Sequence, residues 1–187
     1  YVNITLVWED NNATLPSLTH THDKGCVIGF HPHGMIPYTA SLLTTLPNWK
    51  NGATKRVSHY MLASPIHILP FFKDVAQWLG CLEVSKDVVS QVLDRKGSIM
   101  LVPGGQAEML SSKSWGTTLR INDLHLGFVR MALTNGATLI PILSMGEWEL
   151  MDNIYLPTIQ KWSKAKVGFP VPFVPYGSFV GTPRRAT

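Results

Sequence analysis

The sequence predicts a single α/β domain whose sheet is mixed but largely parallel and is flanked by helices. Apolar runs of strand length alternate along the chain with segments of helical period, and this alternation is typical of parallel βα units. The chain has 187 residues, of which 45% are hydrophobic. That length is enough for one sizeable core and too short to favour two. We therefore expect residues 1–187 to form one domain without a separating linker.

The first half of the chain supplies two strands and two helices. Residues 26–30 form a short apolar run, which indicates a buried strand. Residues 36–46 have helical character, and residues 57–62 are a second strand candidate. A helix is expected over residues 66–79, because Gly80 suits the left-handed position just past a helix end.

The middle of the chain repeats the pattern. Residues 82–84 predict a short strand, and Ser85 is a suitable N-cap for a helix over residues 86–96. The valines and leucine of that helix lie on one face, and Gly97 is expected to stop it. The apolar residues 99–102 then predict a strand.

The last third begins with a turn and ends without regular pattern. Pro103, Gly104 and Gly105 predict a turn. Residues 128–135 predict a helix that Gly136 terminates, and residues 139–143 predict the final strand. Residues 144–187 are rich in proline and aromatic side chains, and we expect them to be mostly irregular.

Composition excludes several classes of protein. Sixteen Lys and Arg against twelve Asp and Glu give a net charge of +4, and the basic residues are scattered, which argues against nucleic-acid binding. Cys26 and Cys81 lie in apolar surroundings, so we expect reduced core thiols. No apolar stretch is long enough to span a membrane. Because the chain begins at Tyr1, we expect it to be part of a longer protein.

Polar side chains follow three of the predicted strands. His31 and His33 follow the first strand, Glu108 follows the fourth, and Ser144 and Glu147 follow the last. In open α/β sheets, ligand sites gather outside the carboxyl ends of the strands. If the strands are parallel, these three groups converge at one edge of the sheet.

The converging groups suit acyl transfer. An imidazole with a pKa of about 6.5 can take a proton from an alcohol and return it to a leaving group. The backbone between His31 and His33 is fixed by a proline, and we expect the two side chains to point to opposite faces, so that only one is the base. Glu108 would orient that base. The Gly104 and Gly105 amides would donate to a developing oxyanion.

Four segments together resemble one known family. They are FHPHGM (30–35), LPFFKDVAQWLGCLEVSKD (69–87), VPGGQAEML (102–110) and LGFVRMALTNGATLIPILSMGEWEL (126–150). In this order and spacing they resemble the type-2 diacylglycerol acyltransferase family, which includes monoacylglycerol and wax-alcohol acyltransferases. The resemblance covers residues 26–181.

The resemblance implies an acyl-CoA-dependent O-acyltransferase that moves a fatty acyl group to the hydroxyl of a neutral lipid such as diacylglycerol, as in triacylglycerol synthesis. It implies a fold related to the glycerol-phosphate acyltransferases. It further implies no metal and no cofactor, since acyl-CoA is a substrate. The expected partners are acyl-CoA, the lipid acceptor and a membrane surface, and the expected location is the endoplasmic reticulum membrane or the lipid droplet.

The motifs also imply which residues form the site. His31, His33 and Glu108 match the catalytic positions. Substrate-positioning roles are expected for four further residues, namely Gly34, Gly104, Gly105 and Glu147. Apart from the motifs, the charge of three cations makes them the expected partners of acyl-CoA phosphates, namely Lys113, Arg120 and Arg130.

Two alternatives belong to other classes of protein. A metal-dependent hydrolase would use His31 and His33 as ligands with Glu108 or Glu147 as a third, because imidazole and carboxylate suit zinc. A non-catalytic lipid-binding domain would instead dock its aromatic and proline-rich tail on a membrane.

Overall fold

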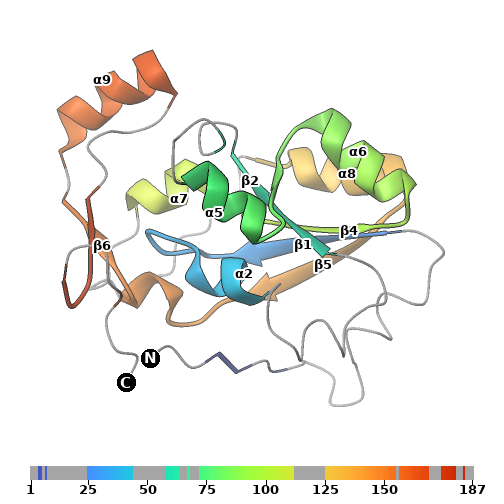
Figure 1. Ribbon diagram of the computed structural model, residues 1–187, viewed down its shortest axis with the longest axis horizontal. Coiled ribbons are helices and arrows are strands. Elements are labelled where there is room, and N and C mark those ends of the chain that lie inside the picture. The colour runs from blue at the N-terminus through green and yellow to red at the C-terminus, as the bar shows by residue number, and fades with distance from the viewer. Residues whose placement is uncertain are drawn as a thin grey trace.

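A five-stranded sheet forms the centre of the protein (Figure 1). The computed structural model describes residues 4–5, 7, 25–43, 58–63, 67, 72–111, 125–154, 156–168, 174–179 and 183. The strands are β1 (Cys26–His31), β2 (Ser58–Leu62), β3 (Leu82–Glu83), β4 (Ser98–Leu101) and β5 (Thr138–Leu143). Their spatial order is β3-β2-β4-β1-β5.

Every ladder of this sheet is parallel. β1 lies between β4 and β5, and its register places Gly29 beside Leu101 and Pro141. The carboxyl ends of these three strands therefore lie at one edge. The predicted α/β domain with a largely parallel sheet is confirmed.

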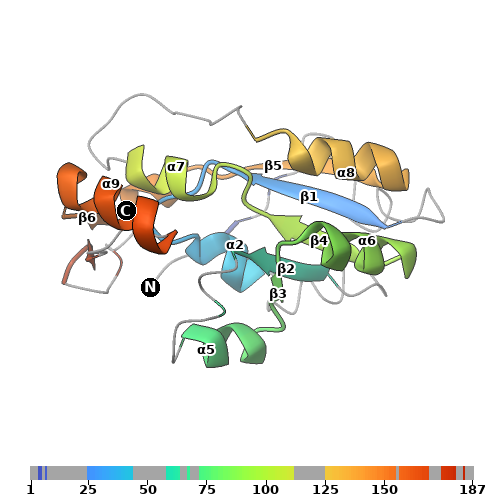
Figure 2. The same ribbon diagram turned by 90° about the horizontal axis from the view of Figure 1, so that it is seen from above.

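Helices cover both faces of the sheet (Figure 2). They are α2 (Tyr38–Leu43), α5 (Phe72–Trp78), α6 (Lys86–Asp94), α7 (Gly105–Ser111), α8 (Gly127–Asn135) and α9 (Pro157–Val167). Successive residues of a strand point to opposite faces. Ile28 accordingly joins a core cluster with α2 and α5, whereas Val27 joins one with α6 and α8. Because β1 is buried on both faces, its sequence is an unbroken apolar run and does not alternate between apolar and polar residues.

Helix α6 begins as predicted and ends differently. The Ser85 side chain accepts a hydrogen bond from the Val88 amide, which is the expected N-cap. The helix ends at Asp94, two residues before the predicted end, and Lys96 takes a left-handed conformation (φ +62°) ahead of Gly97. A Cβ at position 97 would crowd Val92, so Gly97 is required there by close approach.

The other predicted helices can be compared only where the chain is described, and residues 66 and 68–71 of the predicted 66–79 helix lie outside the described residues. α2 begins at Tyr38, and residues 44–46 lie outside the described residues. α5 covers the end of the predicted 66–79 helix, and Gly80 has the expected positive φ of 72°. Gly136 ends α8 in the left-handed conformation, as predicted.

The prediction that residues 144–187 are mostly irregular is wrong for much of the described part. A 3-10 helix η1 (Glu147–Glu149), an antiparallel pair β6 (Asp152–Asn153) and β7 (Pro175–Tyr176), and α9 lie there. Helix α7 was likewise not predicted, because the glycines before it indicated only a turn. α9 does carry start and stop signals, with Pro157 in its first turn and Gly168 at φ +77° after its end.

Cys26 and Cys81 are buried thiols, as expected, and burial raises the pKa of the Cys81 thiol to about 11. Among the described residues, none of the helices combines the length and the apolar character that crossing a bilayer requires.

Candidate active site

Three segments meet beyond the carboxyl ends of β1, β4 and β5. The loop after β1 carries His33 and Gly34, α7 follows β4, and η1 follows β5. A small core cluster joins them, made of Met35, Met109, Leu150 and Met151. The Ser144 amide also donates to the His31 carbonyl at 2.6 Å, which extends the pairing of β1 and β5. These contacts fix the backbone that presents the polar side chains.

His31 and Glu108 form the central pair of the site. His31 Nδ1 lies 3.2 Å from Glu108 Oε1, although 77 residues separate them in sequence. The Glu108 side chain is 2% exposed and that of His31 is 18% exposed. The His31 ring also lies against Phe128, with 6.4 Å between ring centroids. A carboxylate at Nδ1 holds an imidazole in the tautomer whose Nε2 can accept a proton.

His33 is held at both ring nitrogens. Nδ1 lies 2.6 Å from the Gly34 carbonyl and Nε2 lies 2.8 Å from the Gly105 carbonyl. Carbonyl oxygens only accept, so a neutral imidazole can donate to one of the two. Burial lowers the pKa of His33, and it outweighs Glu108 and the two carbonyls, which act in the opposite direction. The ring is therefore anchored in a dry environment.

The two histidines do not point to opposite faces, and that prediction is wrong. Both approach one carboxylate, since His33 Nε2 lies 3.9 Å from Glu108 Oε2 and the His33 amide donates to Oε2 at 3.4 Å. The reason is geometric: in extended chain, residues two apart share a face. Glu108 consequently binds the entire histidine segment.

The two glycines at the start of α7, Gly104 just before it and Gly105 as its first residue, have separate roles. A Cβ on Gly104 would overlap the Glu108 side chain, so glycine is needed there to admit the carboxylate. Gly105 has a positive φ of 49°, and its amide donates to the Val102 carbonyl at 3.2 Å. The Gly105 amide is thus engaged within the turn, while its carbonyl faces His33.

Glu147 is buried beside the site and faces another helix. Its Oε1 accepts the Thr39 amide of α2 at 3.0 Å, and its Oε2 accepts the Ser144 hydroxyl at 3.5 Å. Burial raises the pKa of Glu147, although these hydrogen bonds favour the ionised form. Gly34 lies against the Glu147 backbone, where a Cβ would not fit. Glu147 therefore ties α2 and the histidine loop to η1.

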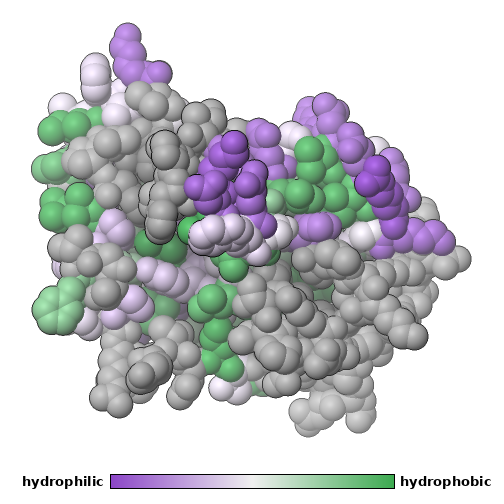
Figure 3. Space-filling model, in the orientation of Figure 1, coloured by the Kyte–Doolittle hydropathy of each residue, from purple (hydrophilic) through white to green (hydrophobic). Residues whose placement is uncertain are grey.

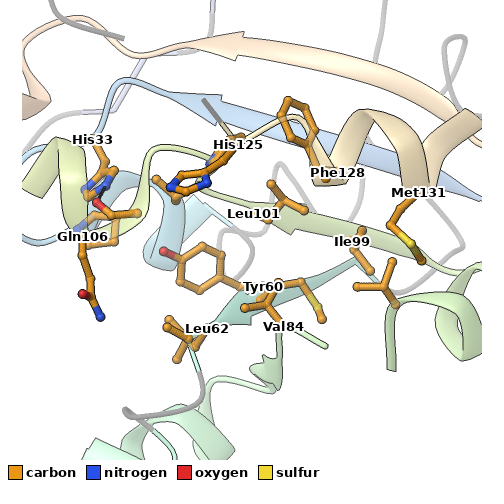
Figure 4. A pocket seen from close by; sticks show the side chains of 18 of the residues that line it. His33, Tyr60, Leu62, Val84, Ile99, Leu101, Gln106, His125, Phe128 and Met131 are labelled. Carbon is orange, nitrogen blue, oxygen red and sulfur yellow. Dashed lines mark hydrogen bonds between the residues drawn. The ribbon is translucent and has the colours of Figure 1, made fainter. Parts of the chain in front are cut away.

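A cavity of about 580 Å³ opens beside the histidine pair (Figure 4). His33 lies at one end of it and Met131 at the other, with Tyr60 and Leu101 between them. Phe128 lines its wall, which places the cavity next to the His31 ring. Most of the lining is apolar, and the volume is in the range of small-molecule sites.

Only part of the predicted cation set can be placed. Arg130 on α8 lines the cavity, whereas Lys113 and Arg120 lie outside the described residues. Four further polar residues in the lining were not predicted to lie there, namely Ser85, Lys86, Gln106 and His125. Gln106 lies within the glycine motif (102–110) and Lys86 within the 69–87 segment, so both belong to motifs that we singled out, although neither was assigned a role.

The described residues contain no group of three or more His, Cys, Asp or Glu side chains arranged to hold a metal ion. Glu147, one candidate third ligand, is directed to α2.

Comparisons with known proteins agree with the motifs. Residues 14–182 match the sequence model of the diacylglycerol acyltransferase family. The chain is 35% identical to diacylglycerol O-acyltransferase 2B of Umbelopsis ramanniana, over 78% of the chain and 44% of that protein. It is 32% identical to mouse 2-acylglycerol O-acyltransferase 1, over 79% of the chain and 47% of that protein.

A third relative is mouse acyl-CoA wax alcohol acyltransferase 2, which is 30% identical over 78% of the chain and 46% of that protein. The chain thus spans less than half the length of these relatives. No solved structure matches it significantly.

Proposed function

The chain belongs to the diacylglycerol acyltransferase family, and from this premise we propose that it forms the catalytic part of an acyl-CoA-dependent O-acyltransferase. The resemblance that the sequence motifs indicated is confirmed at the level of the family. We propose a neutral lipid such as diacylglycerol as the acceptor, because relatives are named for diacylglycerol, 2-acylglycerol and wax alcohol. The observation that carries the proposal is the His31–Glu108 pair beside an apolar cavity.

The proposed reaction needs one base and one proton donor. The acceptor hydroxyl loses its proton to an imidazole and attacks the thioester carbonyl carbon. A C–O bond forms, the C–S bond breaks, and the imidazolium returns the proton to the leaving sulfur of coenzyme A. The products are an ester and free coenzyme A.

His31 is the proposed base. Its Nδ1 is held by Glu108, which leaves Nε2 to meet the acceptor hydroxyl. His33 is unsuited to that role, because carbonyl oxygens contact both of its ring nitrogens. We therefore assign His33 to positioning, since its backbone amide donates to Glu108 Oε2. The Gly104 amide remains the proposed donor to the oxyanion, whereas the Gly105 amide is taken by Val102.

The cavity is the proposed site of the acyl chain. Its apolar lining would shield the chain from water while the thioester lies at the end near His33. Arg130 and Lys86 line the same cavity from α8 and α6, and both residues are exposed. They are the proposed partners of coenzyme A phosphates that stay outside the cavity while the acyl chain enters it.

Separate substitution of the histidines tests the assignment. We expect His31→Gln to lower turnover by on the order of 10²–10⁴-fold, the usual contribution of a general base. His33→Gln keeps one donor for a carbonyl and should cost less. The assay follows labelled acyl-CoA with monoacylglycerol, diacylglycerol, fatty alcohol and sterol acceptors. A larger loss with His33→Gln at equal thermal stability would transfer the base role to His33.

The same assay tests the reaction class. Ester formation that depends on the acceptor supports acyl transfer, and release of free fatty acid alone would indicate a thioesterase. Binding of lipid without consumption of thioester would indicate a lipid-binding domain. For the whole protein we propose the endoplasmic reticulum membrane as its location, which fluorescence microscopy of a tagged full-length protein would test.

A further inference from the structure

Helix α9 is packed with its polar side inward. Among the α9 side chains whose burial is described, Gln160 and Ser163 are the buried ones, at 2% and 4% exposure, whereas Ile159 and Trp162 are 50% and 64% exposed. Gln160 binds the Leu156 amide and the Ile154 carbonyl, and the Ser163 hydroxyl bonds to the Gln160 carbonyl. This is the reverse of the usual arrangement, in which the apolar stripe of a helix faces the core.

Neighbouring segments extend the exposed apolar area. We use the name α9 surface for six exposed side chains of α9, its preceding loop and the β6–β7 region, namely Ile154, Leu156, Ile159, Trp162, Tyr176 and Phe179. Figure 3 shows hydrophobic side chains gathered at the edge of the molecule that carries α9 and β6. Scattered exposed apolar residues are ordinary, but a contiguous group indicates an interaction site.

The charge of α9 indicates the partner. Lys161, Lys164 and Lys166 are exposed, and the helix contains no acidic residue. Exposed tryptophan and isoleucine beside lysines on one short helix match the interfacial helices that lie in the headgroup region of anionic bilayers. A protein partner with an apolar surface would not by itself account for the cluster of lysines.

A hydrogen bond links α9 to the cavity. Gln106 lines the cavity, and its side-chain amide donates to the carbonyl of Gly168 at the end of α9, at 2.9 Å. Figure 2 shows α9 next to α7, and in Figure 1 α9 lies above α7 at the same end of the molecule. A membrane at α9 would therefore lie close to the α7 side of the cavity.

We propose that the α9 surface docks the protein on an anionic lipid bilayer and thereby brings the cavity to the membrane that holds the acceptor; this purpose rests on the proposed function. Ile159 and Trp162 enter the interface, and the lysines bind lipid phosphates or carboxylates. The surface is distinct from the residues assigned to catalysis.

Vesicle binding tests the proposal. Vesicles of phosphatidylcholine with 30% phosphatidylserine are compared with pure phosphatidylcholine by co-sedimentation. Replacing Lys161, Lys164 and Lys166 by Gln should weaken binding to the anionic vesicles by on the order of 100-fold, at roughly 1 kcal/mol for each charge. Ile159→Ser with Trp162→Ser should weaken binding by about tenfold or more.

Matched controls come from other exposed side chains. Trp78 is 82% exposed on α5, so Trp78→Ser removes an indole elsewhere that is more exposed than Trp162. Replacing Lys73, Arg95 and Lys96 by Gln removes three exposed cations outside α9. Neither control should change binding. Equal losses in the controls, binding unaffected by the α9 changes, or no binding by the unaltered chain would each overturn the proposal.

A fluorescent label gives a second measurement that does not depend on loss of binding. An environment-sensitive fluorophore attached through Trp162→Cys should shift to shorter wavelength on vesicles, and one attached through Trp78→Cys should not. Because the native cysteines are buried, labelling is directed to the introduced one. An equal shift at both positions would contradict docking through α9.

Activity separates this proposal from the proposed function. With acceptor in detergent micelles, the α9 variants should transfer acyl groups at the original rate, and on anionic vesicles they should lose activity. His31→Gln should show the opposite pattern, with vesicle binding kept and transfer lost in both settings. If neither the unaltered chain nor any variant transfers acyl groups, the proposed function is wrong. The vesicle-binding data then still show whether the α9 surface binds the bilayer.

Discussion

Glu108 contacts both histidines of the site, so its charge should matter more than its shape. Its carboxylate reaches His31 Nδ1 at 3.2 Å and accepts the His33 amide at 3.4 Å. Glu108→Gln keeps the length of the side chain and removes the charge that stabilises an imidazolium. We expect turnover to fall by on the order of 10²–10⁴-fold. The KM for acyl-CoA should change little, because Glu108 is absent from the cavity lining.

Steady-state kinetics of Glu108→Gln, with thermal unfolding to verify the fold, checks this prediction. A fall in kcat at unchanged unfolding temperature supports it. Unchanged turnover would remove Glu108 from the mechanism.

The adjacent glycines should respond differently to alanine. Gly104→Ala places a methyl group where the Glu108 side chain lies, so the carboxylate must move and activity should fall at least about tenfold, with roughly 1–3 kcal/mol lost from overpacking. The methyl group added by Gly105→Ala has no atom close to it, so only the positive φ at this position makes the change unfavourable, by about 1 kcal/mol. Denaturant unfolding and turnover, measured on both variants, compare the two effects. A smaller activity loss for Gly104→Ala than for Gly105→Ala would contradict this account.

The contacts of some site residues could be predicted from the sequence, and those of others could not. His31 and Glu108 were predicted to meet because each follows a strand, and those strands, β1 and β4, are neighbours in a parallel sheet. The environment of His33 was not predictable, because it depends on where two loop carbonyls point. The partner of Glu147 was missed for a similar reason, since Thr39 lies 108 residues away.

At the level of elements, Glu147 connects η1 to the start of α2 and makes this connection sensitive to pH. Burial raises the pKa of Glu147 above its ordinary value of 4.5. A carboxyl whose pKa is raised by folding favours the native state at pH below 4.5, and this contribution is lost as the pH rises through the raised pKa. Glu147→Gln keeps an oxygen for the Thr39 amide and removes the titration.

We therefore expect the stability of the unaltered chain, relative to Glu147→Gln, to decrease as the pH rises from 4.5 towards neutral. Chemical unfolding of both proteins at several pH values measures the difference. A difference that is constant with pH, or that grows in favour of the unaltered chain, would show that Glu147 is not held in the way described.

Elements with local signals were the ones that could be predicted. α6 has a serine cap and an apolar face, and α8 ends at a left-handed glycine. α7 was missed because it begins at a glycine and is stabilised by the packing of Met109 against Met35 and Met151, which lie far apart in sequence. α9 was missed because its apolar side chains face outward, so its pattern does not indicate a buried stripe.

At the scale of the whole molecule, the cavity combines residues from the central strands, α6, α7 and α8. Met131 lies at the end opposite His33, so its size should limit how long an acyl chain can be (Figure 4). Met131→Trp should fill that end and shift preference from long to short acyl chains by about tenfold. Competition between C8 and C16 acyl-CoA measures the shift.

Leu133→Trp is the matched control for this prediction, because Leu133 is on the same helix and 77% exposed. It should leave chain-length preference unchanged. A shift in the control, or none with Met131→Trp, would place the acyl chain elsewhere.

The strand order has a consequence for how the polypeptide acquires its structure during synthesis. β1 is made first, yet its two neighbours are β4 and β5, which emerge about 70 and 110 residues later. Contacts so distant along the chain form slowly. Until the chain has emerged as far as residue 143, the backbone N–H and C=O groups on one side of β1 therefore lack their β5 partners. That side of β1 stays accessible to chaperones until β5 has been made.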